Sequence, residues 1–231
     1  QVHHGWEARN QFGSDEEIRN EKFLPWLEGA WMTKHKGTYY LQYAAPGTEM
    51  KVYADGVYTC DQPLGNYRYA PYNPFSYKPT GFAASAGHGS MAQDRAGRHW
   101  RVCTMIVGVG HWFDRRLGFF PAGFLPDSSG PDQITCNTYL GDYPQLAPGL
   151  AKDPLADNLV GWMLLSLKKS VTGSSTLDEE HRPEKALDED MTTSWAAATG
   201  NPGEWLQVDL GKPCRIDAVQ LNFADTRATA H

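Results

Sequence analysis

The residue best suited to chemistry is Glu28, a single carboxylate set among bulky apolar residues and followed at once by a glycine. It lies in the string Trp26-Leu27-Glu28-Gly29-Ala30-Trp31-Met32. Burial disfavours the ionised form of a carboxyl group, so such a residue is expected to keep its proton near neutral pH and to act as a general acid. The alternative is that Glu28 begins a strand and either points into solvent or accepts a hydrogen bond.

A second ionisable residue is linked to Glu28 by an internal repeat. When the sequence is shifted by sixty positions, Glu28-Gly29 falls on His88-Gly89, and the same shift matches two further pairs, Gly37 with Gly97 and Tyr39-Tyr40 with His99-Trp100. Two strand-turn-strand units of this kind suggest two blades of a β-propeller, whose innermost strands line a central channel. Glu28 and His88 would then be neighbours around one pocket, unless the match is a coincidence.

The composition favours elements that are short strands. The chain of 231 residues contains 23 Gly, 15 Pro, 8 Trp, 11 Tyr and 9 Phe, and no long amphipathic helix stands out. Lys34-His35-Lys36-Gly37 predicts a hairpin turn before an aromatic strand. The polar loop at residues 46–51 is expected to overhang one end of a sheet, where binding residues often lie.

Charge, cysteines and hydropathy exclude several classes of function. A formal charge of -6 with no basic patch argues against nucleic acid or an anionic membrane surface as the main partner. The four cysteines show no CxxC pair, so neither a zinc site nor a dense disulfide framework is indicated. The apolar run at residues 162–167 is far shorter than the roughly 20 residues of a membrane-spanning helix.

The sequence resembles glycoside hydrolase family 43, and in particular those members that carry a C-terminal discoidin-like module. The strings that carry the resemblance are residues 26–32 with the hairpin at 34–43, residues 55–65, and residues 86–90 with the hairpin at 94–100. They look like the fourth and fifth blades of the five-bladed propeller of that family. The resemblance implies an all-β fold in which a partial propeller at residues 1–150 is followed by a junction at 151–169.

In that family, three carboxylic residues lie at the propeller axis: an aspartate base, an aspartate that modulates the acid, and a glutamate acid. Glu28 matches the acid in its Glu-Gly motif. The resemblance implies inverting hydrolysis of O-glycosyl bonds in a poly- or oligosaccharide, with the two working carboxyls roughly 6.5–9.5 Å apart. His88 falls where many members hold a histidine under an axial metal, commonly calcium and often through water; the alternative is a hydrogen-bonded axial histidine without metal.

The two family aspartates belong to earlier blades, upstream of Gln1, so the catalytic set is expected to be incomplete and these residues inactive alone. Asp55 and Asp94 are interpreted as turn residues rather than as a catalytic base. Because polymeric glycans are met outside the cytoplasm, the family implies a secreted or periplasmic protein whose export signal would precede this chain. A non-catalytic carbohydrate-binding scaffold is the alternative function.

Further candidates for binding sugar are Trp31 and Arg116. An aromatic face such as that of Trp31 suits a sugar ring, although a core tryptophan is an equal alternative. Arg116, beside Arg115, lies near where the family places an arginine close to the sugar, the alternative being a surface salt bridge. Tyr53 and His111 could lie near the pocket, but nothing in their spacing demands it.

Residues 170–231 resemble the first half of a discoidin-like domain, also called coagulation-factor type C domain or carbohydrate-binding module family 32. The strings that carry this are residues 171–175, 185–195 and 203–211. We therefore expect a truncated β-sandwich with uncovered apolar surface. The resemblance also implies a structural calcium held by Asp188, Asp190 and Thr193, but Glu189 replaces the usual glycine and the later glutamate ligand would lie beyond His231, which argues against calcium binding here.

Overall fold

The computed structural model describes residues 4–7, 26–106, 115–139 and 163–224. The chain divides into two compact units, one comprising Gln1–Ile106 with Arg115–Val160 and the other Val107–Asp114 with Gly161–His231. The helices described are three short 3-10 turns, η1 (Gly5–Glu7), η3 (Glu179–His181) and η4 (Pro183–Ala186), and no helix in the described ranges is long and apolar enough to cross a membrane. Most of the predicted junction lies outside the described residues, as does His111.

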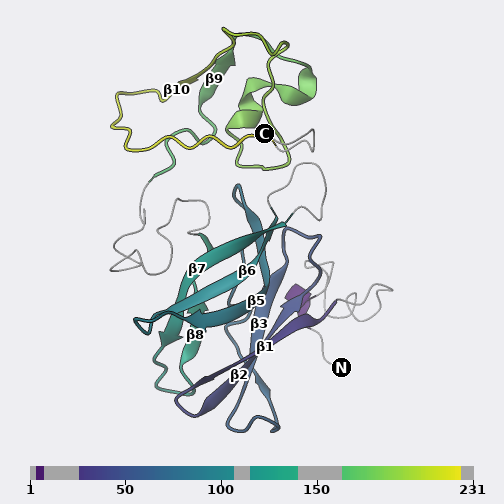
Figure 1. Cartoon of the computed structure of the whole chain (residues 1–231), viewed down its shortest axis with the longest axis vertical. Helices are drawn as coiled ribbons and strands as arrows, with labels where there is room; N and C mark the ends of the chain where they lie inside the picture. The colour runs from purple at the N-terminus through teal and green to yellow at the C-terminus, as the bar shows by residue number, and fades with distance from the viewer. Residues whose placement is uncertain (1–3, 8–25, 107–114, 140–162, 225–231) are drawn as a thin grey trace. The chain divides into compact units, whose positions relative to one another are not determined.

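The first unit contains two four-stranded antiparallel sheets, which confirms the expected all-β fold (Figure 1). The first sheet has the order β1 (Glu28–His35), β2 (Thr38–Ala45), β3 (Ala54–Cys60) and β4 (Arg68–Tyr69). The second has the order β5 (Ala84–Gln93), β6 (His99–Ile106), β7 (Arg115–Leu125) and β8 (Gln133–Cys136). Each sheet is a meander of sequential strands, as a propeller blade is.

The repeat at sixty residues is visible in the turns of the two sheets. Lys36 and Gly37 both adopt positive φ, 46° and 86°, which closes β1 onto β2 with the twist that a two-residue hairpin needs. Gly97, at the equivalent point between β5 and β6, has φ 81°. The predicted hairpins are therefore confirmed, with the same backbone conformation at both turn glycines.

The hydrophobic core of the first unit lies between its two sheets. Strands of both sheets supply its buried residues, which are Tyr40, Val57, Ala70, Phe75, Met91 and Ile134. Packing of side chains from two sheets into one core fixes how the sheets face each other. The inner strands β1 and β5 are consequently held side by side.

A second link between the sheets joins the β1–β2 turn to the β7–β8 loop. His35 Nε2 lies 2.9 Å from Asp132 Oδ2, and Lys36 Nζ lies 2.8 Å from the same oxygen. The His35 ring stacks on Phe124 at 3.9 Å between ring centroids, while the His99 ring meets Phe124 edge-on at 5.2 Å. This histidine cluster ties the outer ends of the two blades together.

The second unit has a two-stranded antiparallel sheet of β9 (Ser170–Gly173) and β10 (Leu206–Asp209). Met191 is fully buried, and the Trp195 indole donates a hydrogen bond to the Ser175 carbonyl at 3.2 Å. The predicted uncovered apolar surface is present, because several large apolar side chains of this unit are exposed: Trp205, Ile216, Val219, Leu221 and Phe223.

Candidate active site

Glu28 is the first residue of β1, and its surroundings differ from those the sequence predicts. The side chain is 38% exposed, and Trp26 and Trp31 are 62% and 42% exposed. The expectation of a carboxylate enclosed by its apolar sequence neighbours is therefore wrong. Residues in extended chain next to each other point to opposite sides, so neighbours in sequence do not enclose one another.

A tyrosine and a histidine from other elements meet the Glu28 carboxylate instead. The Tyr53 hydroxyl donates a hydrogen bond to Glu28 Oε1 at 2.7 Å and lies 3.2 Å from His88 Nδ1. His88 Nδ1 is 3.8 Å from Glu28 Oε1. The predicted proximity of Glu28 and His88 is therefore confirmed, with Tyr53 as the bridging group.

The backbone conformation at position 29 explains why Glu28 is followed by a glycine. It has φ 65°, and the register between β1 and β2 shifts between Glu28 and Trp31, so the strand bulges here. A Cβ on Gly29 would lie 2.8 Å from Cδ2 of His88. The Glu-Gly pair thus allows both the bulge and the close approach of the imidazole.

The Asp55 side chain holds the backbone of His88 in place. The interpretation of Asp55 as a turn residue is therefore wrong. It lies within β3, is 1% exposed, and accepts hydrogen bonds from the backbone N–H groups of His88 at 2.8 Å and Gly89 at 2.9 Å. The Arg101 guanidinium makes a buried ion pair with Oδ2 of this carboxylate, the oxygen that also accepts from Gly89. His88 has φ 53°, a conformation uncommon for a non-glycine residue, and these bonds stabilise it.

Asp94, by contrast, is a turn residue as predicted. Its carboxylate accepts hydrogen bonds from the backbone N–H groups of Ala96 and Arg98 between β5 and β6. Desolvation opposes ionisation of Asp94, but the hydrogen bonds from Trp100, Arg98 and Ala96 together outweigh it and lower the pKa of Asp94 to about 2. Neither aspartate is free to serve as a base toward Glu28.

The loop at residues 46–51 reaches the site. Arg115 Nη1 donates to Thr48 Oγ1 at 3.0 Å, and the charges of Arg115 and Glu49 both act on the Tyr53 hydroxyl. Arg116, the predicted sugar-binding arginine, donates to the Arg115 carbonyl at 3.1 Å. The structure thus brings Arg115 toward Tyr53, whereas Arg116 points its guanidinium back along β7.

Trp31, the other predicted sugar-binding residue, is not a core tryptophan. It pairs with Gln42 across β1 and β2 and keeps much of its ring exposed. An exposed indole can stack on a sugar ring.

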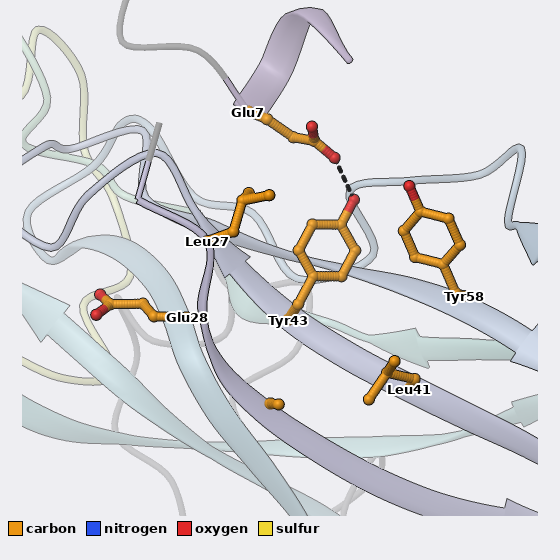
Figure 2. A pocket seen from close by; sticks show the side chains of 7 residues that line it. Glu7, Leu27, Glu28, Leu41, Tyr43 and Tyr58 are labelled. Carbon is orange, nitrogen blue, oxygen red and sulfur yellow. Dashed lines mark hydrogen bonds between the residues drawn. The ribbon is translucent and has the colours of Figure 1, made fainter. Parts of the chain in front are cut away.

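A pocket of about 300 Å³ lies beside β1, lined by Glu7, Leu27, Glu28, Ala30, Leu41, Tyr43 and Tyr58. Figure 2 shows the Glu28 carboxylate pointing away from Tyr43 and Tyr58. The buried Glu7 carboxylate accepts hydrogen bonds from the Tyr43 hydroxyl at 2.5 Å and from the His4 N–H at 2.9 Å. Burial, followed by the bond to Glu7, raises the pKa of Tyr43, so its hydroxyl remains a donor.

Sequence reasoning missed Glu7 because it is separated from its partner strand by many residues. Trp6 Nε1 donates to the Tyr69 hydroxyl at 2.8 Å, and His4 stacks on the Tyr69 ring at 3.5 Å between centroids. Gly56 makes room for the Trp6 ring. No spacing pattern in the sequence links η1 to these strands.

The predicted calcium ligands do share one turn. Asp188 Oδ2 accepts from the Thr193 hydroxyl at 2.8 Å, and Asp188 Oδ1 accepts from the Asp190 N–H at 3.0 Å. Glu189 has φ 59°, which explains why glycine suits this position. Calcium takes six to eight oxygen ligands, and the described parts of the chain contain no cluster of three acidic, histidine or cysteine side chains that could hold a metal ion. The Lys185 ammonium lies 3.8 Å from Asp188 Oδ2, where it partly neutralises the carboxylate.

Two segments of the chain match protein-family models. Residues 8–115 match the model "Glycosyl hydrolases family 43", and residues 170–231 match "F5/8 type C domain". No curated protein matches the sequence.

Solved structures similar to the chain include a GH43 protein, BlXynB, from Bacillus licheniformis, with 23% identity over 48% of this chain and 22% of that one and a TM-score of 0.42. An endo-1,4-beta-xylanase from Bacteroides thetaiotaomicron has 24% identity over 48% and 38% of the two chains and a TM-score of 0.41. The GH43B protein of a Bacteroides ovatus xyloglucan locus has 24% identity over 48% and 23% and a TM-score of 0.42. The chain therefore spans between about a fifth and two fifths of the length of each.

Proposed function

Because the chain joins a glycosyl hydrolase family 43 segment to an F5/8 type C segment, we propose that it takes part in hydrolysis of O-glycosyl bonds in poly- or oligosaccharides. Glu28 is the general acid of this proposal. It protonates the departing glycosidic oxygen, while a carboxylate base activates water on the opposite face of the sugar, with inversion at the anomeric carbon.

The observation that carries the proposal is the carboxyl group of Glu28, partly exposed and anchored through one oxygen. Tyr53 holds Oε1 at 2.7 Å, while the side chain stays 38% exposed, so the carboxyl is both fixed in position and reachable by a ligand. A general acid needs both properties, because proton transfer requires hydrogen-bond reach to the leaving oxygen. His88 adds a second polar group on the same side.

The test is turnover of 4-nitrophenyl arabinosides and xylosides, and of xylobiose and arabinobiose, by the product of the full gene, because neither Asp55 nor Asp94 can serve as the base of the proposed reaction. E28Q should lower kcat about 10²- to 10⁴-fold on the disaccharides, whose leaving groups need protonation, and much less on the nitrophenyl glycosides. E184Q, the same substitution on η4 of the second unit, is the control and should not change turnover. Equal rates for E28Q and the unaltered chain on the disaccharides would remove Glu28 from the mechanism.

Recognition of sugar without hydrolysis is the second candidate, and one observation favours it. Asp55 is the carboxylate that holds the backbone of His88, and it is already committed to Arg101. Among the described residues neither Asp55 nor Asp94 can act as the base, and a site without a base would bind sugar without cleaving it. Calorimetric titration with xylo- and arabino-oligosaccharides separates the two: binding without turnover, weakened by W31A and R116A, would support the scaffold.

The proposal extends to calcium and to location. Water-mediated contact of His88 with a calcium ion is tested by calcium titration of the chain followed by calorimetry, in which the turn of Asp188, Asp190 and Thr193 is not expected to add a second site. Export to the periplasm or medium suits a polysaccharide substrate, and fractionation of cells that express the full gene tests it.

A further inference from the structure

We propose that Tyr53 is a positioning residue for Glu28. The Tyr53 hydroxyl donates to Oε1 of Glu28, so that the acidic proton of Glu28 is carried by Oε2. The inference rests on the proposed role of Glu28 as general acid. It adds a residue and an atom to that role: Tyr53 determines which carboxyl oxygen faces the leaving group.

Tyr53 is rigid enough for this task. It is fully buried just before β3, and its ring packs against the backbone of Gly87, where a Cβ would come within 2.6 Å of ring atom Cδ1. Glu28, in contrast, has a long side chain that is 38% exposed and would sample several rotamers if unheld. A hydrogen bond from a fixed donor to a mobile carboxyl restricts the carboxyl and leaves the donor unchanged.

The hydroxyl also remains a donor under ordinary conditions. Burial raises the pKa of Tyr53, and its hydrogen bond to Glu28 raises it further. The oxygen that accepts this bond is the carbonyl-type oxygen of a carboxylic acid, because the hydroxyl-type oxygen is the weaker acceptor. A proton on Glu28 is therefore directed to Oε2.

The single hydrogen of Tyr53 has a consequence for His88. A phenol has one O–H, and here it is used on Glu28 Oε1 at 2.7 Å. The contact of 3.2 Å between the Tyr53 oxygen and His88 Nδ1 can then be a hydrogen bond only if Nδ1 carries a hydrogen. The distance of 3.8 Å from Nδ1 to Glu28 Oε1 is too long for a direct hydrogen bond. The arrangement is a chain, His88 Nδ1–H to Tyr53 O–H to Glu28 Oε1, which requires a hydrogen on Nδ1 and hence, in a neutral imidazole, the Nδ1–H tautomer.

This tautomer can be measured without any substrate. Long-range proton–nitrogen NMR spectra of the ¹⁵N-histidine-labelled chain, at a pH where His88 is neutral, distinguish a hydrogen on Nδ1 from one on Nε2. The unaltered chain should show Nδ1–H for His88, and Y53F, which removes only the bridging oxygen, should shift it to Nε2–H. Y67F is the matched control, because Tyr67 is a partly buried tyrosine just before β4 whose hydroxyl donates to the Pro63 carbonyl and does not contact His88 or Glu28. An Nε2–H imidazole in the unaltered chain, or a tautomer unaffected by Y53F, would overturn the proposal.

A second variant, E28A, removes the acceptor of the Tyr53 hydrogen bond and leaves the buried Tyr53 ring intact. In E28A the Tyr53 hydrogen is released from Oε1 and can be donated to Nδ1, so His88 should again change to Nε2–H. Retention of Nδ1–H in E28A would show that the bond from Tyr53 to Glu28 does not determine the His88 tautomer, and would also overturn the proposal.

The activity of Y53F separates this proposal from the proposed function. If the chain hydrolyses disaccharides, Y53F should lower kcat by up to about tenfold, the upper end for one hydrogen bond between neutral groups, with KM unchanged and little loss on nitrophenyl glycosides. Equal losses on both substrate types would contradict positioning of the acid while leaving hydrolysis intact. If the unaltered chain turns over none of the substrates but the tautomer changes as expected, hydrolysis by this chain fails and the Tyr53 arrangement stands.

Discussion

Asp55 shows how a single residue can be misjudged from its neighbours in sequence. Asp55-Gly56 is a common turn signal, and the pair nevertheless lies inside β3. The deciding partner is Arg101, forty-six residues away, which together with two backbone N–H groups makes burial of the carboxylate favourable. Local sequence does not contain this information, because the ion pair exists only after the two sheets meet.

Removal of this carboxylate should be costly. D55A leaves the fully buried Arg101 without its counter-ion, so the free energy of unfolding of the first unit should fall by about 3–5 kcal/mol, as for other broken buried ion pairs. Urea denaturation followed by tryptophan fluorescence measures the change. D61A, at an exposed position just after β3, should change stability by less than about 0.5 kcal/mol. Equal effects of the two substitutions would contradict the role given to Asp55.

Glu28 illustrates the opposite case, in which the position was predicted and the reason was wrong. The sixty-residue repeat correctly placed it beside His88. The expected apolar enclosure does not exist, and Tyr53, whose spacing in the sequence carries no compelling signal, anchors the carboxyl instead. The spacing of turns is encoded locally, whereas the identity of a hydrogen-bond partner depends on how sheets pack.

At the scale of elements, the hairpins were the most predictable feature. Their turns depend on a few consecutive residues, and Gly37 and Gly97 supply the positive φ that the turn requires. The bulge at Gly29 was not predicted, since its cause is the approach of β5 and not a turn signal.

Gly29 and Gly37 offer a matched pair for testing this difference. Both have positive φ, but a Cβ on Gly37 would meet nothing within 4 Å, whereas one on Gly29 would press on His88. G37A should therefore cost about 1–2 kcal/mol of backbone strain. G29A should cost more and should also shift the His88 ring resonances, which G37A should leave in place. Equal destabilisation, measured by urea denaturation, would show that the contact with His88 is unimportant.

At the scale of the molecule, the histidine cluster makes the union of the two blades sensitive to pH. Burial lowers the pKa of His99, and the nearby His35 lowers it further. The folded state therefore resists protonating His99, whereas the unfolded chain takes up that proton near pH 6.5. Stability from this source is present above about pH 6.5 and declines as the pH falls below it.

Hydrogen exchange of the β6 amides at pH 7.5 and 5.5 tests this prediction. The unaltered chain should lose protection at the lower pH after correction for the intrinsic exchange rate, and H99Q should lose less. Titration of Asp132 does not interfere with this measurement. Hydrogen bonds from Lys36 and His35 lower the pKa of Asp132, so the stability that its carboxylate contributes is lost only at a pH below the usual pKa of an aspartate. An H99Q variant with the same pH dependence as the unaltered chain would assign the effect to another group.

Because Glu28 and His88 belong to different sheets, the distance between their side chains depends on the angle between the two sheets. Each side chain is fixed to the inner strand of its own sheet, so a small rotation of one sheet against the other changes the distance between carboxylate and imidazole. Tyr53 spans that gap from a third position and would lose one partner or the other. Substitutions in the core between the two sheets, such as at Tyr40 or Met91, are thus expected to alter the hydrogen bonds of the Glu28 carboxyl although these residues do not contact it.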